Sequence, residues 1–222
     1  MVPPTAVLFS AGLDSAVLLA QAAREGPAIP LHVSVGLAWE HTEFEVATRL
    51  LATPPYANAQ PLVRLSLDMR DIYPASHWAV RGEAPAFDTP DEDVYLEGRN
   101  IVLLAKAAVY MAREKLTRVL LGPLAGNPFP DATPEFFSTM QRALATGLNH
   151  PIAIDTPFTE MHKGDVIKLG AELGVPFELT LSCMQPVGGL HCGRCSKCRE
   201  RRDAFHEAGV RDPTEYAAAP LR

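Results

Sequence analysis

A short polar segment near the N-terminus stands between an apolar run and a helix-like pattern. We call it the phosphate loop, and its residues are Ser10, Ala11, Gly12, Leu13, Asp14 and Ser15. Backbone N–H groups in a strand-to-helix turn point at a common centre, where the helix dipole adds partial positive charge. The serine hydroxyls add donors, and Asp14 could hold a Mg²⁺ that bridges phosphates. The loop therefore predicts a phosphate site, the alternative being an ordinary turn with Asp14 as helix N-cap.

Four cysteines lie close together near the C-terminus and offer a complete set of metal ligands. They are Cys183, Cys192, Cys195 and Cys198. Four thiolates can surround one Zn²⁺ tetrahedrally and close a structural site. The C-x2-C-x2-C spacing also occurs in iron–sulfur proteins. The cysteines therefore predict a metal site, with zinc and an iron–sulfur cluster both open. In a reducing compartment such clustering indicates a metal site rather than disulfides. We expect a cytoplasmic protein, because the sequence has neither a signal-peptide-like N-terminus nor an apolar run long enough to span a bilayer.

Five basic residues accompany the cysteines. They are Arg194, Lys197, Arg199, Arg201 and Arg202. They could bind RNA phosphates, or they could neutralise the charge of about −2 on a zinc ion with four thiolates. The whole chain carries a formal net charge of −6, which argues against a nucleic-acid partner and favours neutralisation.

Three further places have residues suited to ligand binding. Lys163 begins a predicted helix, where the helix dipole repels cations, so a functional role is favoured over a surface one. Arg99 could grip a carboxylate or phosphate with two hydrogen bonds, and Asn100 could read a base edge or cap its helix. Asp131 could pair with the amino and N–H edge of a guanine-like ring, or it is a turn residue.

Apolar runs of strand length alternate with helical patterns along most of the chain. Strands are expected at 6–9, 31–36, 61–67, 118–122 and 151–155, and helices at 14–24, 39–51, 98–116, 134–147 and 162–174, with a short basic helix near the C-terminus. This alternation predicts an α/β fold, a Rossmann-like doubly wound parallel sheet of five strands. Residues 1–180 would form this α/β domain, and residues 181–222 a small C-terminal segment that contains the four cysteines.

The predicted order of elements gathers the candidate residues at one edge of the sheet. Ligands of such sheets bind at the carboxyl ends of the strands, where the phosphate loop and residues 36–41 and 122–131 fall. Residues 68–98 show no clear periodicity, and within them residues 88–93 are either a lid or a solvated loop. We expect no membrane association, because no apolar run reaches the roughly 18–20 residues that span a bilayer and the N-terminus does not resemble a signal peptide.

Several segments together resemble one enzyme family. The phosphate loop resembles the S-G-G-x-D-S loop of the ATP pyrophosphatase (PP-loop) superfamily. Four more segments, in the same order, resemble the 7-cyano-7-deazaguanine synthases of queuosine biosynthesis: G-R-N at 98–100, F-P-D-A-T-P-E-F-F at 129–137, residues 156–183, and C-G-R-C-S-K-C-R at 192–199. The resemblance covers most of the chain.

The resemblance implies a function and roles for residues. The carboxylate of 7-carboxy-7-deazaguanine would attack the α-phosphate of ATP, and Mg²⁺-bound pyrophosphate would leave. Ammonia would displace AMP to give an amide, and a second activation would give the nitrile. The phosphate loop would bind ATP, with Asp14 and Lys163 catalytic. Arg99, Asn100 and Asp131 would bind the deazapurine carboxylate, and the four cysteines would hold Zn²⁺. Family members are commonly homodimers.

Four departures from the family pattern leave the acceptor open. Ala11 replaces a loop glycine, Leu96-Glu97 precedes G-R-N, Ala132-Thr133 follows Asp131, and Leu181 replaces a tryptophan. A divergent enzyme could stop at the amide or conjugate a different acceptor. A transfer-RNA-thiolating enzyme using the same adenylation is another alternative. A non-catalytic nucleotide-binding regulator is disfavoured by the intact Asp14, Ser15 and Lys163.

The alanine in the loop makes a conformational prediction. Glycine at that site allows positive φ and close approach to a ligand. If Ala11 is to serve, its φ should be negative, and Gly12 should then have the unusual backbone or the closest phosphate contact. Positive φ at Ala11, or a methyl group in the phosphate site, would count against ATP cleavage.

Overall fold

Five parallel strands form a sheet whose winding reverses at β1. The computed structural model describes residues 3–218. The strands are β1 (Thr5–Leu8), β2 (Ala28–Ser34), β3 (Val63–Ser66), β4 (Arg118–Leu120) and β5 (Ala153–Asp155), in the order β3-β2-β1-β4-β5. The predicted doubly wound parallel sheet is confirmed. The chain moves outward from β1 in one direction and then returns to β4 on its other side, which creates a switch point between the two strands.

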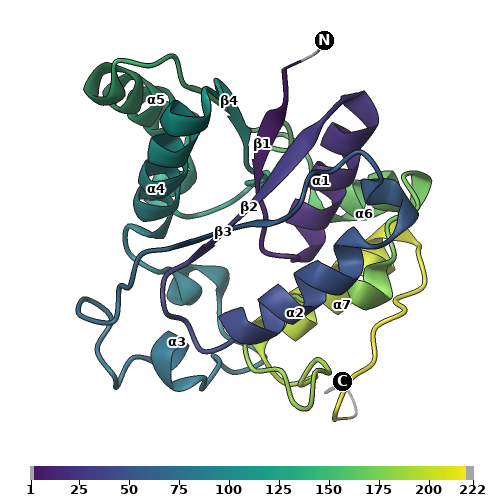
Figure 1. The fold of residues 1–222 in the computed structure, drawn as a ribbon. Helices are drawn as coiled ribbons and strands as arrows, with labels where there is room; N and C mark the ends of the chain where they lie inside the picture. The colour runs from purple at the N-terminus through teal and green to yellow at the C-terminus, as the bar shows by residue number, and fades with distance from the viewer. Residues whose placement is uncertain (1–2, 219–222) are drawn as a thin grey trace.

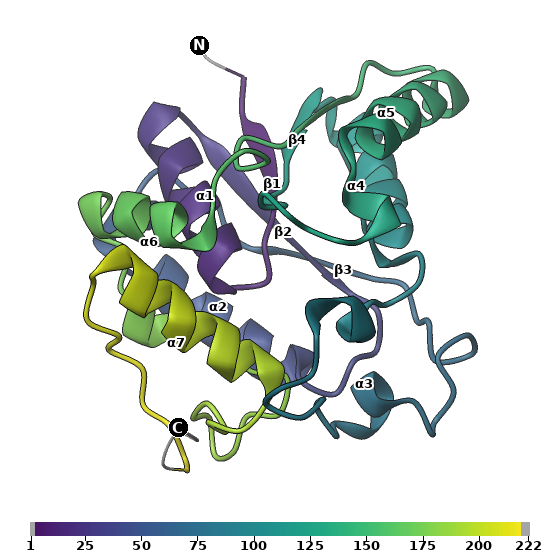
Figure 2. The ribbon, with the colours of Figure 1, turned by 180° about the vertical axis from the view of Figure 1, so that it is seen from behind.

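Helices cover both faces of this sheet (Figures 1 and 2). On one face lie α4 (Arg99–Glu114) and α5 (Pro134–Leu148); on the other lie α1 (Leu13–Glu25), α2 (Glu40–Leu51), α6 (Lys163–Glu172) and α7 (Ser196–Ala208). Ala6 and Val7 of β1 belong to different hydrophobic clusters, because successive strand residues point to opposite faces. β1 is thus buried on both sides, as a central parallel strand must be.

The segment between β3 and α4 has little regular structure, as predicted. It contains the short helix α3 (Trp78–Arg81), and single 3₁₀ turns occur here and elsewhere at Pro54–Tyr56, Asp91–Val94, Pro130–Ala132 and Phe177–Leu179. Trp39 and Trp78 stack with ring centroids 5.8 Å apart and belong to a third hydrophobic cluster with Tyr73 and Leu96. The two tryptophans therefore hold this segment against the rest of the fold.

The start of β2 was predicted incorrectly. The strand begins at Ala28, three residues before the expected 31–36, and it includes Pro30. Ala28 and Ile29 are buried and pair with Thr5 and Ala6 of β1, so tertiary burial outweighs the loop tendency of proline. Beyond Ser34 the backbone leaves the ladder, because Glu40 accepts the N–H groups of Val35 and Gly36.

The cysteine segment packs into the same core as helices α1 and α6 beside the sheet. Leu181, Cys183 and Phe205 belong to the hydrophobic cluster that contains Val17 of α1 and Ile167 of α6. Among the described residues, no helix is long and apolar enough to cross a membrane.

Helices α1 and α6 approach closely at a glycine, which gives a test of the fold. A Cβ on Gly170 would lie 2.6 Å from both Val17 Cγ2 and Phe177 Cζ. We expect Gly170→Ala to lower the free energy of unfolding by about 1–3 kcal/mol through overpacking. The matched control is Gly147→Ala in α5, where a Cβ would meet nothing within 4 Å. This substitution should raise the free energy of unfolding by about 0.5–1 kcal/mol. Chemical denaturation measures both; equal effects would contradict this packing.

Candidate active site and cysteine centre

The structure brings together residues that lie far apart in the sequence. A cavity of about 290 Å³, the main cleft, opens at the switch point of the sheet. It is lined by four phosphate-loop residues and by three from the α4 and α5 region: Ser10, Gly12, Asp14, Ser15, Arg99, Asn100 and Asp131. The carboxyl ends of β1 and β4 thus place the predicted phosphate and acceptor residues around one space.

Hydrogen bonds within the phosphate loop hold its turn. Ser10 N–H donates to Ser15 Oγ at 3.3 Å, and Ser15 Oγ donates to the Gly12 carbonyl at 3.1 Å. Gly12 is the N-cap of α1, in the extended region, and no side chain caps this end. The alternative in which Asp14 serves as the N-cap is therefore wrong, and Asp14 stands within the first helical turn.

The conformational prediction for Ala11 was also wrong. Its φ is +57°, whereas Gly12 has φ −67°, so the alanine keeps the left-handed backbone that costs an L-residue roughly 1–2 kcal/mol. Ala11 is fully buried, does not line the main cleft, and its carbonyl accepts the N–H of Leu181 at 2.9 Å. According to the prediction made from the sequence, positive φ at Ala11 counts against ATP cleavage. However, the Ala11 methyl group is buried inside the fold, so it does not occupy the main cleft.

A second cavity, of about 430 Å³, adjoins the main cleft at Asp14. We call it the phosphate-side cavity. Lys163, the first residue of α6, places Nζ 3.2 Å from Asp14 Oδ2 and also pairs with Glu200 of α7. Burial alone would lower the pKa of Lys163, but Asp14 and Glu200 outweigh it and raise that pKa above its usual value. The predicted catalytic pair is therefore in contact, and Lys163 is a stable cation.

Asp14 keeps one oxygen free for a ligand. Asp14 Oδ1 is buried and has no hydrogen-bond partner among the described residues. A buried carboxylate oxygen without a partner is costly unless a ligand satisfies it. Carboxylate oxygens beside phosphate groups are the ligands that Mg²⁺ prefers in nucleotide sites. The residue present therefore fits the expected Mg²⁺.

The acceptor residues form a small network at the start of α4. Asp131 Oδ2 accepts the backbone N–H of Asn100 at 3.0 Å, and the Asp131 carbonyl accepts Asn100 Nδ2 at 2.9 Å. Burial raises the pKa of Asp131, while Asn100 and Arg99 oppose this shift. Arg99 Nε is buried without a partner among the described residues. Arg99 thus offers a free donor to an anion in the main cleft.

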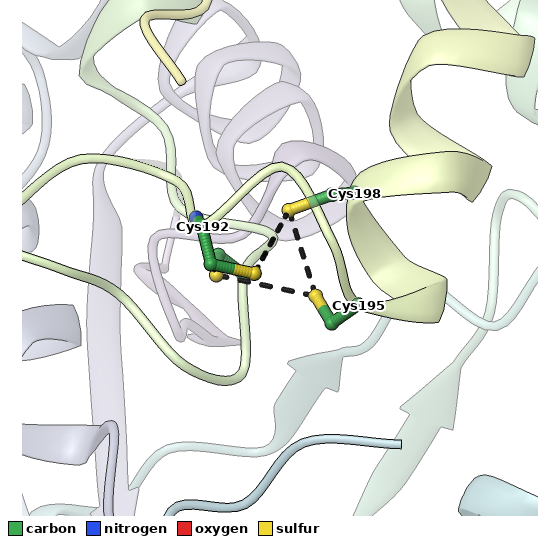
Figure 3. A group of neighbouring side chains, drawn as sticks. Cys192, Cys195 and Cys198 are labelled. Carbon is green, nitrogen blue, oxygen red and sulfur yellow. Dashed lines mark hydrogen bonds between the residues drawn. The ribbon is translucent and has the colours of Figure 1, made fainter. Parts of the chain in front are cut away.

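The four cysteines converge on one point at the start of α7. Their Sγ atoms all lie within 4.8 Å of one another, and Figure 3 shows Cys192, Cys195 and Cys198 turned toward one another. The measured Sγ separations are 3.8 Å for Cys192–Cys198, 3.5 Å for Cys195–Cys198 and 4.0 Å for Cys195–Cys183. Zn–S bonds of about 2.3 Å give tetrahedral edges of about 3.8 Å. The thiol positions therefore fit a single tetrahedral ion, whereas the four cysteines of a [4Fe–4S] cluster each bind a different iron and stand farther apart.

Comparisons with known proteins identify the family of the chain. The family model described as "Queuosine biosynthesis protein QueC" matches residues 5–209. The 7-cyano-7-deazaguanine synthase of Anaeromyxobacter dehalogenans (strain 2CP-C) is 34% identical over 223 residues, covering 95% of this chain and 94% of the relative. The enzyme of the same name from Methanothrix thermoacetophila is 36% identical over 222 residues, covering 94% and 96%. The chain belongs to the QueC family.

A solved structure supports the fold of this QueC-family chain. It is described as a predicted subunit of tRNA methyltransferase from Methanocaldococcus jannaschii, and it matches with a TM-score of 0.51 and 15% sequence identity, covering 94% of this chain and 89% of that chain. At this identity the likeness concerns the fold alone. The resemblance stated from the motifs is thus confirmed at the level of the family.

The departures from the QueC pattern have structural roles. Thr133 Oγ1 accepts Phe136 N–H at 3.1 Å and caps α5, while Leu96 is buried and lines the main cleft. Glu97 and Leu181 contribute only backbone groups here: the Glu97 carbonyl accepts the hydroxyl of Tyr73 at 2.7 Å, and the Leu181 N–H donates to the Ala11 carbonyl at 2.9 Å, so these contacts do not depend on the substituted side chains. Of these positions, Leu96 touches the space where an acceptor would bind.

The basic residues near the cysteines separate into two groups. Arg201 is fully buried and donates to Thr180, Ser182, Thr214 and the carbonyl of Phe177, so it supports the fold of the cysteine segment. Two others, Lys197 and Arg199, line the phosphate-side cavity. Sequence reasoning missed their neighbour Glu200. The spacing of Lys197 and Glu200, three residues apart after Cys195, was the available signal for an ion pair on one helix face.

Three histidines make local contacts away from the main cleft. His191 Nε2 accepts the N–H of Ser182 at 3.0 Å, and burial together with Arg201 lowers its pKa to about 3. It is a neutral acceptor beside the cysteine centre. His41 is exposed and pairs with Glu45, and His162 forms a capping box with Asp165 at the start of α6.

The cysteine centre predicts one metal ion per chain. We expect the purified protein to be colourless and to contain one equivalent of zinc by elemental analysis. Cys195→Ala should lose the metal and several kcal/mol of stability, because structural zinc binding contributes directly to folding. As a control, a strong chelator should lower the melting temperature of the wild type and leave that of the variant unchanged. A brown protein that absorbs near 400 nm would contradict the zinc assignment.

Proposed function

We propose that this chain is an ATP-dependent carbon–nitrogen ligase that converts 7-carboxy-7-deazaguanine and ammonia to 7-cyano-7-deazaguanine through adenylated intermediates. One observation carries the proposal. The phosphate loop and the acceptor residues Arg99, Asn100 and Asp131 line a single cleft, in a chain of the QueC family. An enzyme that joins ATP to a small carboxylate needs both binding sites to open on the same space.

The proposed first step uses the loop to hold ATP and the cleft to hold the acceptor. Backbone N–H groups of the loop and the start of α1 face the phosphates. Arg99, whose Nε lacks a protein partner, grips the carboxylate and turns one oxygen toward the α-phosphate. Attack by that oxygen releases pyrophosphate at the loop, on the side of Asp14 and Lys163. The carboxylate becomes a good electrophile only after this step, because its oxygen then leaves with AMP.

Lys163 and Asp14 have complementary roles in this proposal. Lys163 keeps its proton and neutralises charge that develops on the leaving pyrophosphate. The Oδ1 atom of Asp14 would hold Mg²⁺, which when bound would neutralise phosphate charge. The four cysteines would hold Zn²⁺, and this would make the start of α7 rigid. Ammonia then displaces AMP, and a second activation of the amide oxygen leads to the nitrile.

The segment 88–93 has contacts that support a covering role over the phosphate-side cavity. The Thr89 carbonyl accepts Arg199 Nη2 at 3.2 Å, and Asp91 pairs with Lys197 at 3.9 Å. We propose that this segment limits the entry of water, which would otherwise hydrolyse an acyl-adenylate.

A second candidate function keeps the same first step and changes the end product. Where the family usually has an apolar residue and Pro before G-R-N, this chain has Leu96 and then Glu97, so the departure at Glu97 directly follows a residue that lines the main cleft. This favours, as the alternative, an enzyme that stops at the amide or joins the activated carboxylate to another amine. The thiolating alternative has less support, because the cysteine spacing fits a single ion better than a cluster.

The test is incubation with ATP, Mg²⁺, ammonium and 7-carboxy-7-deazaguanine, followed by mass spectrometry. We expect the nitrile, together with AMP and pyrophosphate. The amide alone would support the truncated reaction, and release of neither AMP nor pyrophosphate would refute both readings.

The variant Asp14→Ala should abolish pyrophosphate release while the protein stays folded by circular dichroism. The matched control is Asp68→Ala, which removes an exposed carboxylate paired with Arg70 and should leave the rate unchanged. Near-normal turnover in Asp14→Ala would show that the loop has been assigned wrongly.

We also propose a cytoplasmic homodimer in which residues 1–180 carry the nucleotide site and residues 181–222 the metal site. Four unpaired cysteines suit a reducing compartment.

The dimer surface would lie on α4. Ile101 and Val109 of α4 are 47% and 50% exposed and lie on the same side of the helix. Light scattering should give twice the monomer mass, and Val109→Glu should give a monomer. Ile72→Glu, at an exposed loop position, is the control that should stay dimeric; a monomeric wild type would refute the dimer.

A further inference from the structure

A row of alternating charges leads from the phosphate loop to the cysteine helix. Asp14 pairs with Lys163, Lys163 with Glu200, Glu200 with Lys197, and Lys197 with Asp91. All five residues line the phosphate-side cavity. With three carboxylates and two ammonium groups, the row has a formal charge of −1. Pyrophosphate can bind here only if the ammonium groups of Lys163 and Lys197 lie side by side and both face it.

Glu200 is the residue that presents them together. Its Oε1 accepts from Lys163 Nζ, and its Oε2 accepts from Lys197 Nζ at 2.5 Å. Each carboxylate oxygen of Glu200 thus faces one ammonium group, from α6 and from α7 respectively. One ionised carboxylate therefore holds two like charges side by side, which would otherwise repel each other.

The cysteine centre determines where Glu200 stands. Cys195 is the N-cap of α7 and Cys198 lies in its first turn, so Lys197 and Glu200 belong to the same two turns. Lys163 comes from α6, which packs against α7. The two lysines therefore reach the cavity from separate helices and meet only at Glu200.

We propose that Lys197 is a second pyrophosphate-binding cation beside Lys163, and that Glu200 is a positioning residue that holds both. The proposal rests on the proposed function, because it assigns the leaving group of that reaction to this cavity. Lys197 has a flexible four-carbon stem and three donors, so it can turn from Asp91 toward a phosphate oxygen while Glu200 keeps it in the cavity. Lys163, from α6, would likewise turn its ammonium group toward the pyrophosphate while Glu200 keeps it in the cavity.

Titration calorimetry with Mg²⁺-pyrophosphate tests the proposal without the acceptor. We expect Lys197→Met to weaken binding about 10-fold, the loss of one charge-assisted hydrogen bond. We expect Glu200→Gln to weaken it at least 3-fold, although removing a negative charge would by itself strengthen anion binding. The matched control is Asp203→Asn, which removes an exposed carboxylate of the same helix that also lines the cavity; this variant should bind equally or slightly more tightly. Metal content and melting temperature should be those of the wild type.

The sign of the Glu200→Gln effect separates positioning from simple electrostatics. Tighter binding in Glu200→Gln, or binding within 2-fold of wild type in Lys197→Met, would overturn the proposal, as would a wild type that does not bind Mg²⁺-pyrophosphate. In turnover, Glu200→Gln should lower kcat about 10-fold and leave the KM for the acceptor unchanged, with Glu200→Asp restoring part of the rate. If the wild type binds pyrophosphate in this way yet forms no nitrile, the proposed function fails and this inference stands.

Discussion

The pairing of one buried cation constrains how three distant parts of the chain meet. Lys163 begins a helix, where the dipole disfavours positive charge, and its side chain is only 18% exposed. A buried ammonium group must be paired, and its partners are Asp14 from the loop after β1 and Glu200 from α7. The loop, α6 and α7 are therefore held around a single point, and both cavities open beside it.

The cysteine centre gains a functional meaning from the same constraint. A metal ion held by the four thiolates would fix the N-terminus of α7, and the first two turns of that helix carry Lys197 and Glu200, of which Glu200 pairs with Lys163. Removal of the metal would affect stability directly and would also release Lys197 and Glu200 from their places. A site that is structural in its chemistry can therefore influence catalysis through the position of a helix.

Local patterns were enough to predict the sheet, the loop position and the cysteine cluster. Alternating apolar runs and helical patterns identify parallel strands, because central strands such as β1 are buried on both faces. The details that failed depend on contacts distant in sequence. The start of β2 is set by pairing of Ala28 with Thr5, and Ala11 has positive φ in a loop tied to Leu181. Glu200 was missed because its meeting with Lys163 arises only when α6 and α7 pack.

The departures from the family pattern lie in the backbone around the loop and near the acceptor residues. They leave in place the charged residues that would act on ATP. Ala11 introduces strain beneath the loop, yet Asp14, Ser15 and Lys163 keep their places around it. Thr133 caps a helix, and Asp131 holds Asn100 through both its side chain and its carbonyl. Arg99 is left with a free donor in the main cleft beside Leu96. If the proposed function holds, selection of the acceptor depends on how a carboxylate reaches Arg99 past Leu96, whereas ATP cleavage depends on the ion pairs of Lys163 with Asp14 and Glu200.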